Sequence, residues 1–141
     1  MNIRIGSAPD SWGVWFPDDP RQMPWHRFLD ELAEAGYEWL ELGPYGYLPT
    51  DADTLRSELQ RRSLKASASV VMAPLEDPSA WPELDRQVLE AGELLAELGA
   101  GFLVLIDDSF TDLRTGEPKT AARLDETGWR RLIDATHRAA D

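Results

Sequence analysis

Apolar residues along the chain follow two alternating spacings. Short apolar runs, typical of β-strands, are separated by longer segments in which apolar residues recur every three or four positions, as on the buried face of a helix. The runs predict strands at 2–6, 37–42, 64–71 and 102–106, and the longer segments predict helices from Pro24 to Gly36, at about 51–62, at about 80–98, and from about 126 to the end.

This strand–helix alternation predicts a parallel sheet with right-handed crossovers. The turns from helix to strand are very short, whereas the loops from strand to helix are long, as at 107–125. Because ligands of parallel α/β proteins bind beyond the carboxyl ends of the strands, the long loops mark the expected functional face. Four βα units form either a small open doubly wound sheet or half of a (β/α)₈ TIM barrel. The segment after the first strand, GSAPDSWG, has no glycine-rich phosphate motif, which favours the half barrel.

Composition narrows the class of protein. The length of 141 residues and the apolar fraction of 43% predict a single globular domain, 1–141. The net charge of −12 argues against nucleic acid and anionic membranes as partners. Cysteine is absent, so disulfides and thiolate chemistry are excluded, and no apolar run is long enough to span a bilayer. The sequence starts with a strand pattern and not with a signal peptide, so we expect a cytoplasmic protein.

The stretch ELGPYGYLP, at 41–49, is the strongest candidate for a ligand-facing loop. Glu41 alternates with Leu40 and Leu42, and because leucines suit the side that faces the helices, Glu41 is expected to point inward. Its carboxylate would then act as a general base or bind substrate hydroxyls, unless it is a structural partner of a nearby arginine. The prolines and glycines would stiffen a wall carrying Tyr45 and Tyr47.

Other candidates lie after the first and fourth strands. Trp12 follows the first strand and could wall a sugar-like ring or pack within a lid. Asp107 and Asp108 end the fourth strand, where they could orient hydroxyls, bind a metal or order the loop.

Serines and histidines are weaker candidates. Ser67 and Ser69 would point inward but have no histidine placed to activate them. His26 and His137 lie in predicted helices and are expected at the surface, and no metal-binding spacing is present.

Two long motifs, GSAPDSWGVWFPDDPRQMPW and GYEWLELGPYGYLP, resemble the amino-terminal half of inosose dehydratases, and SFTDLRTGEP fits the same pattern. These enzymes belong to the sugar isomerase/epimerase superfamily, whose members have a xylose-isomerase-like TIM barrel. The resemblance implies a parallel (βα)₄ half of a (β/α)₈ barrel that acts on a small-molecule polyol or keto-sugar. It also implies metal-assisted dehydration of a keto-inositol or proton-transfer isomerisation of a sugar, with Mn²⁺ or Co²⁺ as the metal.

The same resemblance implies that the metal ligands come from the second half of the barrel, beyond this chain. Carried over to this sequence, the substrate-side residues are Trp12, Glu41, Tyr45 and Asp107, with Glu41 as the candidate catalytic residue. We therefore expect no metal ligands here, no activity from this chain alone, and self-association into a homo-oligomer that covers the open sheet. Two alternatives are a non-catalytic half barrel, which binds a polyol or self-assembles, and an unrelated open α/β binding module.

Overall fold

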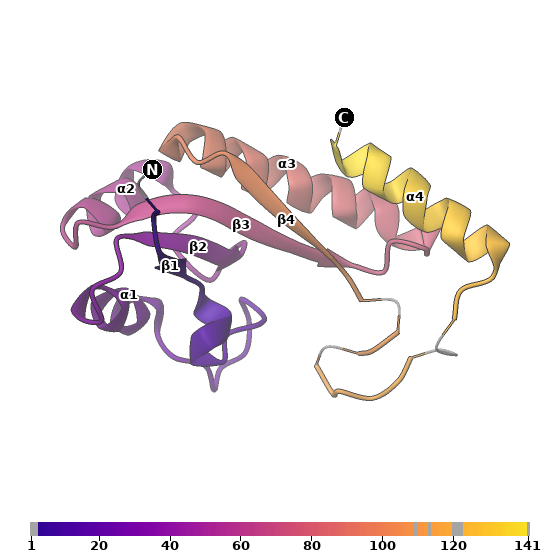
Figure 1. Cartoon of the computed structure of the whole chain (residues 1–141), viewed down its shortest axis with the longest axis horizontal. Helices are drawn as coiled ribbons and strands as arrows, with labels where there is room; N and C mark the ends of the chain where they lie inside the picture. Colours follow the sequence, from indigo (N-terminus) through magenta and orange to yellow (C-terminus); the bar gives the residue numbers. More distant parts are fainter. Residues whose placement is uncertain (1–2, 109, 113, 120–122, 141) are drawn as a thin grey trace. The chain divides into compact units, whose positions relative to one another are not determined.

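The computed structural model of the chain describes residues 3–108, 110–112, 114–119 and 123–140, and it has the predicted strand–helix alternation (Figure 1). These described residues form four strands, four α-helices and two short 3-10 helices. Their order is β1 (Gly6–Ser7), η1 (Pro9–Trp12), α1 (Trp25–Glu34), β2 (Trp39–Pro44), α2 (Ala52–Gln60), β3 (Lys65–Ala73), η2 (Pro78–Ala80), α3 (Trp81–Leu98), β4 (Phe102–Asp107) and α4 (Glu126–Ala140). The predicted α/β class is confirmed.

The strands form one sheet in the order β1-β2-β3-β4. Strand β2 is parallel to β1, with Gly6 opposite Trp39, and parallel to β3, with Leu40 opposite Ala66. The register between β2 and β3 shifts directly after Leu40, so that Glu41 lies opposite Ala68. Parallel neighbours joined through helices are the arrangement that the sequence predicts.

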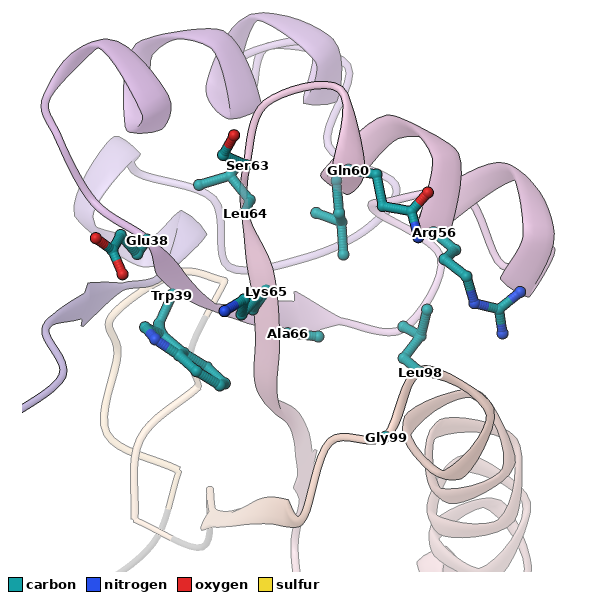
Figure 2. A pocket seen from close by; sticks show the side chains of 11 residues that line it. Glu38, Trp39, Arg56, Gln60, Ser63, Leu64, Lys65, Ala66, Leu98 and Gly99 are labelled. Atoms are coloured by element: carbon teal, nitrogen blue, oxygen red, sulfur yellow. The ribbon is translucent and has the colours of Figure 1, made fainter.

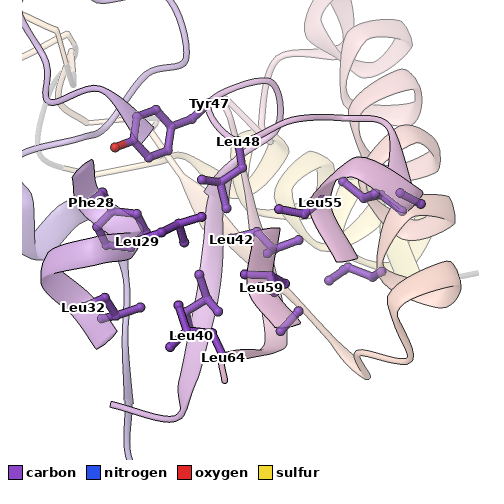
Figure 3. Packing of buried hydrophobic residues seen from close by; sticks show 14 of the residues in the cluster. Phe28, Leu29, Leu32, Leu40, Leu42, Tyr47, Leu48, Leu55, Leu59 and Leu64 are labelled. Carbon is purple, nitrogen blue, oxygen red and sulfur yellow. The ribbon is translucent and has the colours of Figure 1, made fainter. Parts of the chain in front are cut away.

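The chain divides into two compact units, one of Met1–Val70 with Glu90–Val104 and the other of Val71–Leu89 with Leu105–Asp141. The first unit contains the main core, in which side chains from one face of the sheet pack against helices (Figure 3). Its buried leucines are Leu29, Leu32, Leu40, Leu42, Leu48, Leu55, Leu59, Leu64, Leu94 and Leu95. The apolar stripes of α1 and α2 are therefore buried, as their spacing predicts.

The second unit is held by contacts of a different kind. The Trp81 Nε1–H donates to the Leu75 carbonyl at 2.9 Å, and the Arg138 guanidinium pairs with the Asp85 carboxylate, with Nε to Oδ1 at 2.6 Å. Ala135 of α4 is fully buried. Together these contacts connect α4 with the first half of α3 and the turn that precedes it.

Two strand predictions need correction. The predicted strand 2–6 is reduced to Gly6–Ser7, with Asn2 outside the described residues, and the predicted strand 37–42 is observed at Trp39–Pro44. Ile3 and Ile5 are 79% and 68% exposed, because β1 is the outer strand of the sheet order. Strand β4, at the other end of the sheet order, also carries an exposed apolar side chain, Phe102, which is 72% exposed.

Gly43 allows the end of β2 to lie directly against η1. Its φ is +75°, and a Cβ built at this position would lie 2.7 Å from Pro9 Cγ. Side chains larger than hydrogen are therefore excluded by both conformation and space. This close approach fixes η1, and with it Asp10 and Trp12, next to the strand that carries Glu41.

We predict that Gly43→Ala destabilises the chain more than the matched substitution Gly99→Ala. Gly99 also has a positive φ, +72°, but a Cβ there meets nothing within 4 Å. The left-handed conformation costs an alanine about 1–2 kcal/mol at either position, and Gly43→Ala adds the clash with Pro9. Urea unfolding of both variants measures the difference. Equal losses of unfolding free energy would show that η1 is not held by this contact.

Candidate functional site

Glu41 lies on the face of β2 opposite the core. Leu40 and Leu42, on either side of it, are buried among the helices, whereas the Glu41 side chain is half-buried on the other face. This is the orientation that the alternation predicts. Within the part of the chain that the structure describes, the Glu41 carboxylate forms no hydrogen bond or ion pair, so the predicted alternative of a structural partner for an arginine gains no support there.

The surroundings of Glu41 favour its protonated form. Partial burial raises the pKa of the Glu41 carboxyl above its ordinary value, and the negative charge of Asp10 raises it further. A carboxyl group with a raised pKa, close to a second carboxylate, is a common arrangement for acid–base chemistry or for recognition of hydroxyl groups.

Asp10 reaches this position because η1 follows β1 directly. Pro9 begins the 3-10 helix and is buried, whereas Asp10 is exposed. Asp10 is not among the site residues predicted from the sequence. Its position one residue after a proline, at the carboxyl end of the first strand, was the signal that could have indicated it.

Trp12 packs on the core with its polar atom already satisfied. Its indole Nε1–H donates to Glu31 Oε2 at 2.9 Å, and its ring lies edge-on to Phe28, with centroids 5.1 Å apart. Hydrogen bonds from Arg27 and from Trp12 lower the pKa of the Glu31 carboxyl. The partly buried ring thus offers an apolar surface only, in agreement with either predicted role, a ring wall or a packed lid.

Tyr45 and Tyr47, the two tyrosines of the loop at 41–49, have different environments. Tyr47 is 5% exposed, and its hydroxyl donates to the Met23 carbonyl at 3.0 Å. Burial raises the pKa of Tyr47 to about 12. The prediction that Tyr47 faces a ligand is wrong, because its ring fills the core beside Phe28 (Figure 3). Tyr45 is half-buried at the edge of that core, and its predicted role in substrate binding stays a prediction.

Asp107 and Asp108, in the second unit, both have partners. Asp107 Oδ1 accepts a hydrogen bond from the Leu75 backbone N–H at 3.3 Å, and Asp108 Oδ2 pairs with Lys119 Nζ at 2.7 Å. Both carboxylates therefore order the chain around the end of β4, one of the roles that the sequence left open. A substrate role of Asp107 stays a prediction.

The serines and histidines that are weaker candidates in the sequence have structural or surface positions. The hydroxyls of Ser67 and Ser69 donate to the carbonyls of Leu40 and Gly43, each at 2.8 Å. His26 and His137 are exposed on α1 and α4.

Within the described residues, no group of three or more His, Cys, Asp or Glu side chains is arranged to hold a metal ion. None of the described helices is long and apolar enough to cross a membrane.

The chain is similar to a curated enzyme and to solved structures. It is 28% identical over 146 residues to the inosose dehydratase of Geobacillus kaustophilus (strain HTA426), across 98% of this chain and 46% of that enzyme. A sugar phosphate isomerase/epimerase from Parabacteroides distasonis superposes with a TM-score of 0.57 at 21% identity, across 96% of this chain and 46% of the other. A family 2 AP endonuclease from Brucella melitensis superposes with a TM-score of 0.64 at 17% identity, across 99% and 50%. No protein-family model matches the chain.

These similarities confirm the predicted fold and the predicted resemblance. The chain has the fold of part of a TIM barrel. It spans about half the length of the relatives it matches.

The pKa directions predict opposite effects for two matched substitutions, Glu41→Gln and Glu31→Gln. Because the pKa of Glu41 is raised in the folded chain, the unfolded chain loses the Glu41 proton at a lower pH than the folded chain does. As the pH rises above 4.5, the ordinary pKa of glutamate, Glu41 therefore lowers the free energy of unfolding. Glu41→Gln should therefore stabilise the chain near neutral pH, and the gain should vanish in acid. The pKa of Glu31 is lowered in the folded chain, so its ionised carboxylate stabilises the fold near neutral pH. Glu31→Gln should therefore destabilise the chain near neutral pH.

Urea unfolding at neutral and acid pH tests both signs. A Glu41→Gln variant that is less stable than the wild type at neutral pH would show that the carboxylate makes a stabilising contact in the folded chain.

Proposed function

We propose that this chain forms the substrate-binding part of a sugar or polyol isomerase/epimerase or of an inosose dehydratase-like enzyme. The single observation that carries the proposal is Glu41, a half-buried carboxyl without a partner among the described residues, at the inner face of a parallel sheet, with its pKa raised. The 28% identity to an inosose dehydratase along 98% of the chain supports the same substrate class.

In the proposed mechanism, Glu41 takes up or delivers a proton at a carbon next to a hydroxyl or keto group. Its raised pKa makes it a better base than an ordinary glutamate and keeps more of its acid form available near neutral pH. Trp12 would bound the ring with its apolar face, Tyr45 would line the loop side, and Asp107 would orient hydroxyls.

A divalent metal, Mn²⁺ or Co²⁺ by resemblance, would hold vicinal oxygens of the substrate. The described residues do not by themselves form a ligand set for it, and we propose that its ligands lie beyond this chain. None of the roles proposed here requires a residue of this chain to coordinate the metal. These roles are substrate binding, orientation and proton transfer by Trp12, Tyr45, Asp107 and Glu41.

The structural similarity to an AP endonuclease raises nucleic acid as a second substrate class. A fold shared at 17% identity hosts many activities, so the charge of the chain decides between the classes. Binding of a phosphate backbone requires clustered Lys and Arg, whereas this chain has 26 acidic residues against 14 basic ones. This balance favours a neutral polyol.

We predict that the isolated chain neither binds Mn²⁺ at micromolar concentrations nor dehydrates a keto-inositol. Calorimetry with Mn²⁺ on the wild type, Glu41→Gln and Asp107→Asn tests the first part. Micromolar binding that either substitution abolishes would place the metal site within these residues.

The role of Glu41 is tested in a complete barrel in which this chain replaces the matching part of the Geobacillus enzyme. Removal of a positioned acid or base typically lowers turnover about 10²–10⁴-fold, so Glu41→Gln should do so without lowering the melting temperature. A variant with normal turnover would exclude Glu41 from the chemistry.

We further propose that this chain self-associates. Strands β1 and β4 are the outer strands of the sheet, and apolar side chains beside both are exposed, with Ile3 and Ile5 at one edge and Phe102 and Val104 at the other. Unpaired parallel edges with exposed apolar side chains favour pairing with a further strand.

Self-association predicts that Phe102→Asp weakens the oligomer, because the charge would enter the apolar edge of β4. Leu89→Asp is the matched control, since Leu89 is 61% exposed and belongs to the helix α3 instead of a strand. Sedimentation equilibrium across micromolar concentrations measures both. A monomeric wild type, or equal weakening by the two substitutions, would contradict the proposal.

A further inference from the structure

Two neighbouring cavities lie at the amino ends of the strands in the first unit. One has a volume of about 740 Å³ and the other about 390 Å³, and Glu38, Trp39 and Lys65 line both. Ser63 and Gly99, from the turns that precede β3 and β4, line the larger one (Figure 2). Arg4 lines the smaller one. Glu41 lines neither cavity.

Two cations stack on one indole ring at the boundary of these cavities. The Arg4 guanidinium carbon lies 4.7 Å from the Trp39 ring centroid, and Lys65 Nζ lies 5.5 Å from it. These distances are within the range of cation–π interaction. The two cationic centres are therefore at most about 10 Å apart, and the ring restricts the freedom of both side chains.

The backbone explains why these side chains meet. Trp39 is opposite Lys65 in the parallel register, and the Lys65 N–H donates to the Glu38 carbonyl at 2.9 Å. Gly6 is opposite Trp39 on the other side, where a Cβ would lie 2.7 Å from the Trp39 carbonyl oxygen. The close approach at Gly6 brings the segment that carries Arg4 against the Trp39 ring.

Most cations of this acidic chain have carboxylate partners. Salt bridges in the described residues include those of Arg21, Arg27, Arg56, Arg61, Arg62, Arg86, Arg130, Arg138 and Lys119. Within that same part of the chain, Arg4 and Lys65 make no salt bridge, although Glu38 lines the same cavities. Their charge is thus available for a ligand.

We propose that this Arg4–Trp39–Lys65 cluster binds an oxyanion, either inorganic phosphate or the phosphoryl group of a small sugar phosphate. The Arg4 guanidinium can donate two parallel N–H hydrogen bonds, and the Lys65 ammonium provides a compact positive charge. Both suit the several oxygens of a phosphate. The two cations outweigh the charge of Glu38, so the lining of the smaller cavity is net positive in a chain of net charge −12. The larger cavity beside it has room for an attached sugar.

Calorimetric titration of the wild-type chain with sodium phosphate tests the proposal, with the Trp39 indole N–H resonance followed in parallel. We expect saturable binding with a dissociation constant of about 1 mM or lower. Because a hydrogen bond to a charged group contributes about 1.5–3 kcal/mol, Arg4→Gln and Lys65→Gln should each weaken binding about 10-fold or more. Arg61→Gln is the matched control, since it removes the same charge from the exposed end of α2 and should leave binding unchanged.

Two further ligands distinguish the sources of the oxyanion. D-Fructose 6-phosphate that binds more tightly than phosphate would identify a sugar phosphate as the ligand, and equal affinity would identify the phosphate group alone. D-Fructose should not compete with either. The proposal is overturned if neither anion binds saturably, if Arg4→Gln and Lys65→Gln leave binding unchanged, or if Arg61→Gln weakens it equally. These outcomes do not depend on Glu41, so they are separate from the test of the proposed enzyme function.

Discussion

The alternation of side chains along β2 is the constraint on which the candidate site depends. Leu40 and Leu42 must be buried against the helices, and this requirement turns Glu41 and Trp39 to the opposite face. A shift of one residue in register would exchange the two faces and remove leucines from the core. The hydrophobic core thus fixes the orientation of a carboxylate that it does not contact.

The same constraint accounts for two sets of side chains on one surface of the strand. Glu41 is near Asp10, whose charge favours the protonated carboxyl. Two residues earlier, Trp39 is in contact with Arg4 and Lys65. An acidic pair and a basic pair therefore follow each other along β2, and the backbone positions of Glu41 and Trp39 are about 7 Å apart at the usual rise of about 3.3 Å per residue.

Much of the fold could be predicted from the sequence because its periodic signals are local. The α1 stripe and the position of Glu41 on the face of β2 away from the buried leucines follow from spacing alone, and the structure confirms both. Tyr47 could not be assigned in this way, since only the packed core shows that its ring lies beside Phe28 with its hydroxyl on the Met23 carbonyl. The interaction of Asp10 with Glu41 could not be predicted for a similar reason. The proximity of Asp10 to Glu41 depends on the contact between Pro9 and Gly43, which no spacing rule indicates.

The central claim is that Glu41 is a perturbed carboxyl coupled to Asp10 on the inner face of the sheet. Titration of the Glu41 side-chain carboxyl by carbon-detected NMR, in the wild type and in Asp10→Asn, measures this directly. The account predicts a pKa above the ordinary glutamate value of 4.5 in the wild type and a smaller elevation in Asp10→Asn, because burial remains when the neighbouring charge is removed. A Glu41 pKa at or below the ordinary value, unchanged by Asp10→Asn, would contradict it.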